Sequence, residues 1–210
     1  MNQILLATKI LSCGSLGANA KKSMSDIYEL EFIGRGGQGA KTAAEMIARY
    51  ALKNGKYVQS FPDYGPERKG APVRAFTRIS SIDIRGCSSE ANPNVLIIID
   101  PTLLILNGTL FNIKEGQVVL VNSDQSPESL KKELGFKGEL YTVNATKIAL
   151  DVMKSAITNT TMLGAFAKVT GYLNLEDLKK EIFEEFGKKL DEDVLNKNYL
   201  LTQRAFDEVR

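Results

Sequence analysis

The chain has 210 residues, with 27 lysines and arginines against 25 aspartates and glutamates, and it carries a net charge of +2 at pH 7. This balance gives no general electrostatic reason to expect nucleic acid or an anionic membrane as a partner. Histidine is absent, and the only two cysteines are Cys13 and Cys87. The chain therefore lacks the usual ligand sets of zinc and iron–sulfur sites as well as a histidine base, and we expect no cofactor or metal in it. The length fits one domain, and two isolated cysteines form no disulfide framework, which is typical of a cytoplasmic protein.

Residues 1–24 differ in composition from the rest of the chain. The stretch 4–11 is apolar apart from one lysine, and the small residues after it end at 18–20 in Ala-Asn-Ala, which resembles a signal-peptidase site. Because the lysine interrupts a short apolar core and no basic residue precedes that core, we favour a non-native extension, with Met24 as the natural start, over a secretory signal. No other stretch approaches the ~18 apolar residues of a membrane span. We therefore expect one domain over 25–210.

A glycine-dense segment lies between a strand pattern at 28–32 and a helix pattern at 40–52. Its glycines remove the Cβ atoms that would keep an anion away from the unpaired N–H groups at the start of the helix. Gly34, Gly36 and Gly39 match the dinucleotide fingerprint G-x-G-x-x-G. The next strand pattern, however, lacks the acidic residue that would bind a ribose. A nucleotide or anion site and a simple tight turn both stay open.

The rest of the chain alternates between strand and helix patterns. Further strands are expected at 56–61, 72–79, 95–99, 117–121 and 139–143, and further helices at 127–134, from Asn144, at 162–169 and twice within 175–210. This order predicts a three-layer α/β/α domain with a sheet that is mainly parallel or mixed and with a helical C-terminal third. We expect 159–161 to cap a helix and Gly164 to let another backbone approach.

Two positions allow more than one interpretation. In the strand at 72–79, Arg74, Phe76 and Arg78 share one face, which is either a solvated edge with arginine stems over the ring or a surface shaped for anions or a partner. Asp100 follows the buried strand at 95–99, where open α/β sheets place their ligands, although Asp-Pro is also an ordinary way to leave a strand.

Three motifs resemble the gamma subunit of pyruvate:ferredoxin oxidoreductase: GRGGQGAK at 34–41, SFPDYGPERKGAPVRAF at 60–76 and NTTMLGA at 159–165. The resemblance covers about 26–210, and the ERxGAP form is more similar to the pyruvate branch than to the 2-oxoglutarate branch. It implies a multisubunit enzyme that converts pyruvate and coenzyme A to acetyl-CoA and CO2 and passes electrons to ferredoxin. Thiamine diphosphate, Mg2+ and iron–sulfur clusters would be carried by alpha, beta and delta subunits, and this chain would be inactive alone.

The resemblance also supplies binding or interface candidates, none of them catalytic. They are Gly34, Arg35, Gly36, Gly37, Gln38, Gly39, Lys41, Tyr64, Gly65, Glu67, Arg68 and Arg74. We expect a positive, backbone-lined wall near the path of coenzyme A or a neighbouring subunit, because unpaired N–H groups and guanidinium forks both favour phosphate. The competing interpretation for Tyr64, Glu67 and Arg68 is structural, in fixing their own loop.

Three other functions stay open: a free-standing dinucleotide-binding protein, a non-catalytic interaction scaffold on the same sheet, and a gamma subunit specific for another 2-oxoacid. A free-standing binder should retain a nucleotide when purified alone, whereas a scaffold should assemble without affecting turnover. Substrate choice is expected to depend on other chains.

Overall fold

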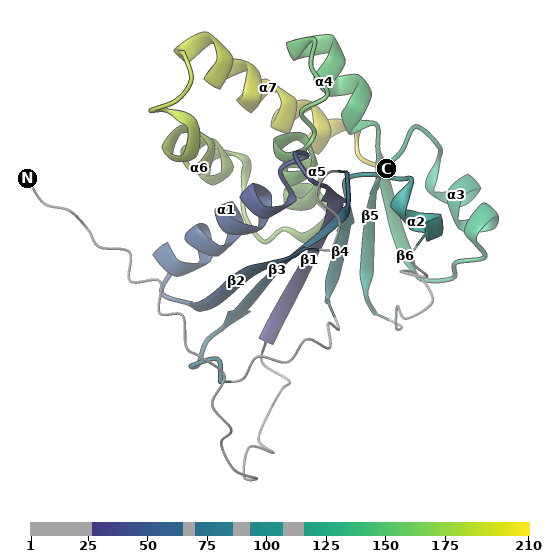
Figure 1. Cartoon of the computed structure of the whole chain (residues 1–210), viewed down its shortest axis with the longest axis horizontal. Coiled ribbons are helices and arrows are strands. Elements are labelled where there is room, and N and C mark those ends of the chain that lie inside the picture. Colours follow the sequence, from purple (N-terminus) through teal and green to yellow (C-terminus); the bar gives the residue numbers. More distant parts are fainter. Residues whose placement is uncertain (1–26, 65–69, 86–92, 107–115) are drawn as a thin grey trace, which may run out of the picture.

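The computed structural model describes residues 27–64, 70–85, 93–106 and 116–210 (Figure 1). The elements, in chain order, are β1 (Ile27–Arg35), α1 (Ala40–Lys53), β2 (Tyr57–Tyr64), β3 (Pro72–Ser80), β4 (Val95–Ile98), α2 (Leu103–Leu106), β5 (Val118–Asn122), α3 (Pro127–Leu134), β6 (Glu139–Val143), α4 (Ala145–Met153), α5 (Asn159–Thr170), α6 (Leu175–Phe186) and α7 (Glu192–Glu208). The expected alternation of strands and helices, followed by a helical C-terminal region, is confirmed.

The strands form one mixed sheet in the order β2-β3-β1-β4-β5-β6. The pairs β1–β4, β4–β5 and β5–β6 are parallel, whereas β3 pairs antiparallel with both β2 and β1. From β1 the chain runs through α1 to β2 at one edge of the sheet, and from β4 it runs through α2 to β5 on the opposite side. The direction of winding therefore reverses between β1 and β4, which is the topological switch point where open α/β sheets bind ligands.

Helices cover both faces of the sheet, as a three-layer fold requires. The larger core cluster joins Phe32 and Ile97 of the sheet to helix residues such as Ile47 and Phe166. The smaller cluster lies on the other face, where α2 and α3 cover the parallel strands. Consecutive residues of one strand belong to different clusters, because side chains alternate between the two faces of a sheet.

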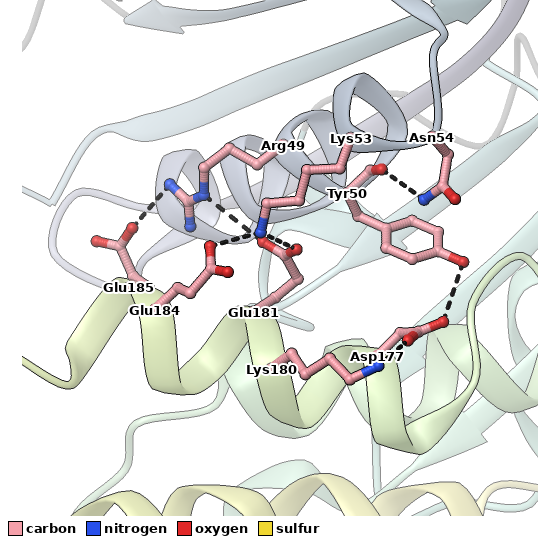
Figure 2. Close-up of polar contacts among 9 residues, drawn as sticks. All are labelled: Arg49, Tyr50, Lys53, Asn54, Asp177, Lys180, Glu181, Glu184 and Glu185. Atoms are coloured by element: carbon pink, nitrogen blue, oxygen red, sulfur yellow. Dashed lines mark hydrogen bonds and ion pairs between the residues drawn. The ribbon is translucent and has the colours of Figure 1, made fainter. Parts of the chain in front are cut away.

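The C-terminal helices pack on α1 and α5. Leu178 and Ile182 of α6, which share one face of the helix, lie in the larger core. A Cβ atom on Gly164 of α5 would overlap the backbone of Thr202 in α7, so the expected close approach at this glycine is confirmed. Figure 2 shows that Arg49 and the neighbouring α1 residue Lys53 extend toward carboxylates of α6.

Two local expectations were wrong. β2 continues to Tyr64, three residues beyond the strand expected at 56–61, because Pro62 and its neighbours pair with β3 through Ala75. Proline is tolerated there because β2 is an edge strand. Residues 159–161 lie inside α5 instead of capping it: Thr158 is the N-cap residue, and its side chain forms no capping hydrogen bond.

Candidate functional site

The glycine turn joins the end of β1 to the start of α1 at the switch point of the sheet. Gly37 and Gly39 have φ values of 95° and 79°, a left-handed conformation that glycine adopts without a Cβ penalty. Gly39 is the N-cap residue of α1 and has no side chain to cap the helix. The backbone N–H groups of Gly37, Gly39 and Ala40 have no hydrogen-bond acceptor among the described residues. Together with the positive end of the helix dipole, these donors are suited to an anion.

Arg35 ties this turn to two other loops. Its Nε donates to Asp100 Oδ2 at 3.1 Å, and its two terminal nitrogens donate to Gly70 O at 2.8 Å and Thr102 Oγ1 at 2.9 Å. The backbone amide of Gly36 donates to Ala71 O at 3.2 Å, next to the contact between Arg35 and Gly70. The ends of three chain segments therefore meet at one guanidinium group.

Asp100 is the acceptor at the centre of this network. Its two oxygens receive hydrogen bonds from Arg35, from Gln38 Nε2 at 2.9 Å, and from the Thr102 amide and hydroxyl at 3.0 and 2.6 Å. Gln38 also accepts from the Arg35 amide through Oε1 at 2.7 Å. Burial alone would raise the pKa of Asp100, but the hydrogen bonds from Thr102 and Gln38, with the charge of Arg35, outweigh burial and lower it. Asp100 is therefore ionised at neutral pH.

The open side of the turn is formed by backbone and by Lys41. A Cβ atom on Gly36 would meet nothing within 4 Å among the described residues. The Lys41 side chain is 51 % exposed, and within the described part of the chain its one ion pair is a long contact, 3.5 Å, with Glu45 one turn along α1. Its ammonium group therefore stays available in solvent beside the uncapped helix start.

Asn159 closes the inner side of the turn. A Cβ atom on Gly39 would lie 2.5 Å from Asn159 Nδ2, so only glycine fits at this position. Asn159 is buried, and its Oδ1 has no hydrogen-bond partner among the described residues; the same is true of Thr161 Oγ1 two residues later. The first and third sequence motifs, far apart along the chain, are thus packed against each other at the N-termini of α1 and α5.

The arginine-bearing face of β3 is engaged in ion pairs. Arg74 Nε lies 2.5 Å from Glu31 Oε1 of β1, and the guanidinium stacks 5.1 Å above the centre of the Phe76 ring. Arg78 pairs with Glu29 at 3.4 Å and stacks on Phe61 of β2. It is the guanidinium groups that lie over aromatic rings, and β3 is not an edge strand because it lies between β2 and β1. Both guanidinium groups already have carboxylate partners within the sheet.

A separate pocket of about 380 Å³ opens at the same edge of the sheet, between the starts of α3 and α4. It is lined by Pro101, Leu104, Asn122, Ser123, Asp124, Gln125, Leu130, Glu133, Leu134, Asn144 and Thr146. The described lining residues combine apolar side chains with carboxylates, carboxamides and hydroxyls, and they include no lysine or arginine. This chemistry suits a neutral or cationic group and disfavours a phosphate.

The predicted candidates fall into three groups. Gly34 to Gly39 and Lys41 meet at the turn; Tyr64, 62 % exposed, and Arg74 lie on β2 and β3. Gly65, Glu67 and Arg68 lie outside the described residues. Asp100 and Thr102 were not among the candidates, although Asp100 was noted at the end of a buried strand. The signal that identifies them is a polar pair immediately after the parallel strand beside the glycine turn.

The described residues contain no group of three or more His, Cys, Asp or Glu side chains that could hold a metal ion. In the same part of the chain, no helix combines the length and apolarity that crossing a bilayer demands.

Residues 29–208 match the family model described as pyruvate ferredoxin/flavodoxin oxidoreductase. The chain belongs to this family. It is 45 % identical over 186 residues to pyruvate synthase subunit PorC of Thermotoga maritima, covering 87 % of this chain and 95 % of the relative. It is also 45 % identical over 182 residues to the common subunit gamma of the pyruvate/ketoisovalerate oxidoreductases of Thermococcus kodakarensis, covering 86 % and 96 %. The resemblance to gamma subunits of this oxidoreductase family is confirmed.

Solved structures of the oxidoreductase family agree with the fold. The crystal structure of the PORC subunit of Thermotoga maritima pyruvate oxidoreductase superposes with a TM-score of 0.75 at 41 % identity, covering 88 % of this chain and 98 % of that one. A 2-oxoglutarate:ferredoxin oxidoreductase chain from Magnetococcus marinus, solved with 2-oxoglutarate, coenzyme A and succinyl-CoA bound, superposes at 0.68 with 23 % identity. This chain covers 30 % of that longer one, so the likeness shows the shared fold alone.

Proposed function

We propose that this chain is the gamma subunit of a pyruvate:ferredoxin oxidoreductase, which converts pyruvate and coenzyme A to acetyl-CoA and CO2 and passes the electrons to ferredoxin. The observation that carries this proposal is the 45 % identity to PorC of Thermotoga maritima along 95 % of that subunit. Thiamine diphosphate, Mg2+ and the iron–sulfur clusters belong to alpha, beta and delta subunits in this arrangement. Histidine is absent and only two cysteines exist, so this chain lacks the usual ligands of an iron–sulfur cluster.

The contribution of this chain is assembly and one wall of the coenzyme A path. The support is the uncapped start of α1, the open space at Gly36 and the exposed ammonium of Lys41. The groups that face coenzyme A in this wall are backbone N–H groups and the Lys41 ammonium. The guanidinium groups of Arg35 and Arg74 contribute less, because they are bonded to carboxylates within the domain. For this reason charge reversal at Arg74 is a poor test: it would strand the buried Glu31, which is 2 % exposed.

A reconstitution experiment tests the subunit assignment. The complex is assembled from the other subunits with and without this chain, and pyruvate-dependent reduction of a viologen dye is measured. We expect omission to abolish turnover. Full turnover without this chain would overturn the assignment and favour the interaction scaffold, and a nucleotide retained by the isolated chain would favour the dinucleotide-binding alternative.

The coenzyme A wall is tested with Lys41→Glu in the assembled complex. The matched control is Lys197→Glu, which also changes an exposed lysine with an (i, i+4) acidic neighbour, Asp193, but lies on α7. We expect Lys41→Glu to raise the KM for coenzyme A or to weaken assembly, and Lys197→Glu to do neither. Equal behaviour of the two variants would contradict the wall.

A further inference from the structure

We propose that Asp100 is a positioning residue that sets the geometry of the glycine turn through Arg35 and Gln38. This inference rests on the proposed function only for its effect on coenzyme A or assembly; the geometric part stands on contacts within the chain. Asp100 lies at the carboxyl end of β4, directly across the switch point from Arg35 at the end of β1. In a dinucleotide-binding sheet that crevice receives the ligand, whereas here an ion pair of the chain itself occupies it.

Asp100 is held too firmly to be a free ligand. Its side chain is 11 % exposed, and its oxygens accept from Arg35, Gln38 and both donors of Thr102. A carboxylate with four such donors has little remaining capacity to accept from a substrate. Its charge is therefore directed at neighbouring side chains of this domain.

The side chains that Asp100 contacts define the turn. Gln38 is part of the turn, and its carboxamide bridges Asp100 Oδ2 to the Arg35 backbone amide. The Gln38 amide in turn donates to Arg35 O at 3.0 Å, which closes the turn. Asp100 thus orients the side chain that fixes the turn conformation from inside.

Arg35 carries the same constraint to a second loop. With its Nε on Asp100, the guanidinium plane is fixed, and a terminal nitrogen reaches Gly70 O. The adjacent backbone hydrogen bond from Gly36 N–H to Ala71 O holds the same two segments together. A guanidinium fork is needed for this, since a lysine ammonium cannot hold the three separate acceptors in one plane. The carboxylate of Asp100 therefore aligns the turn with the chain at Gly70.

The test combines amide hydrogen exchange with kinetics of the assembled enzyme. In Asp100→Asn the side chain keeps its shape but loses its charge and one of its two acceptor oxygens, so the four donors from Arg35, Gln38 and Thr102 are left with a single carbonyl oxygen. We expect exchange at the amides of Gly36 and Gln38 to accelerate by about tenfold or more, the size of losing a hydrogen bond to a charged group. The KM for coenzyme A should rise, or assembly weaken, with kcat within about twofold.

Further variants keep the proposal falsifiable. Asp83→Asn is the matched control, because Asp83 also pairs with an arginine, Arg85, at 3.2 Å but is exposed and remote from the turn; it should change neither readout. If Asp100→Asn fails to fold, Thr102→Val removes the hydroxyl that donates to Asp100 and accepts from Arg35, and it should give a smaller effect in the same direction. Arg35→Lys should resemble Asp100→Asn, because it keeps the charge and loses the fork.

The outcomes separate this inference from the proposed function. Unchanged exchange at Gly36 and Gln38 in every foldable variant would overturn the positioning role of Asp100. Faster exchange with a higher KM or weaker assembly supports both proposals. Faster exchange with unaltered KM and assembly would confirm the positioning role and would overturn the coenzyme A wall.

Discussion

The ammonium of Lys53 on α1 lies 2.6 Å from Glu181 Oε1 on α6, and the Glu181 side chain is only 3 % exposed (Figure 2). Arg49 approaches the other oxygen of the same carboxylate at 3.7 Å. A carboxylate at this depth requires charge compensation, since removing it from water is costly. The α1–α6 contact therefore depends on electrostatics as well as on the apolar stripe of Leu178 and Ile182.

Replacing Glu181 with glutamine should destabilise the domain. Glu181→Gln keeps the volume but leaves two cations facing a neutral amide, and we expect the free energy of unfolding to fall by about 1–3 kcal/mol. Urea denaturation of the isolated chain measures it. The control is Glu184→Gln, which removes a 57 % exposed partner of Lys53 and should cost less than about 1 kcal/mol. Equal effects of the two variants would contradict a special role for the buried carboxylate.

A methyl group at Gly164 should separate α5 from α7. In Gly164→Ala the new Cβ overlaps the carbonyl of Thr202, and backbone cannot yield as a side chain does. We expect a loss of about 1–3 kcal/mol in the free energy of unfolding, the cost of overpacking a core. The matched control is Gly36→Ala, the same substitution where no described atom lies within 4 Å. A neutral Gly164→Ala would show that the two helices are more loosely packed than the structure indicates.

Gly36→Ala is also a probe of function. The fold should tolerate it within about 0.5 kcal/mol, because the position is open and has an ordinary φ. The added methyl projects where a ligand or neighbouring subunit must approach the turn, so we expect weaker assembly or a higher KM for coenzyme A. Gly37→Ala, at φ 95°, should instead lose stability by about 1–3 kcal/mol. Wild-type assembly and kinetics of Gly36→Ala would argue that nothing approaches this side of the turn.

Alkaline pH should weaken the domain through Tyr28. Burial, and secondarily the nearby Tyr172, raise the pKa of Tyr28 from 10.0 to about 12. A group whose pKa is higher in the folded state stabilises the fold below its unfolded pKa, so this contribution is lost as pH rises from about 10 through 12. Tyr28→Phe should therefore show a smaller loss of stability over that window in urea denaturation. Tyr64→Phe, at an exposed tyrosine, is the control and should leave the loss unchanged.

In the sheet, the local sequence pattern was sufficient to predict where most strands lie. The strands expected at 28–32, 95–99 and 139–143 overlap β1, β4 and β6, because alternating or continuous β-branched runs carry the strand signal within a few residues. The end of β2 was missed because Pro62 is a strong turn signal locally, and only pairing with β3 shows that it lies on an edge. That pairing partner is more than ten residues away in sequence.

The candidate site divides in the same manner. Glycine spacing between a strand and a helix predicted the turn and its open backbone, and the structure places Gly37 and Gly39 at positive φ. The partners of Arg35 could not be predicted, because Asp100 and Thr102 are 65 and 67 residues away. Nor could the packing of Asn159 on Gly39, which depends on how two helix starts meet.

By itself, the amino-acid sequence determined the alternation of elements, the absence of histidine and of clustered cysteines, and the three motifs that indicated the oxidoreductase family. These are properties of composition and of short spacing, which local backbone preference and side-chain chemistry express directly. Tertiary structure alone decided which charges remain available: it neutralised Arg35 and Arg74 with Asp100 and Glu31 and left Lys41 and the helix N–H groups open. The reason is physical, since a charge is free or paired only according to what the folded chain brings within a few ångströms of it.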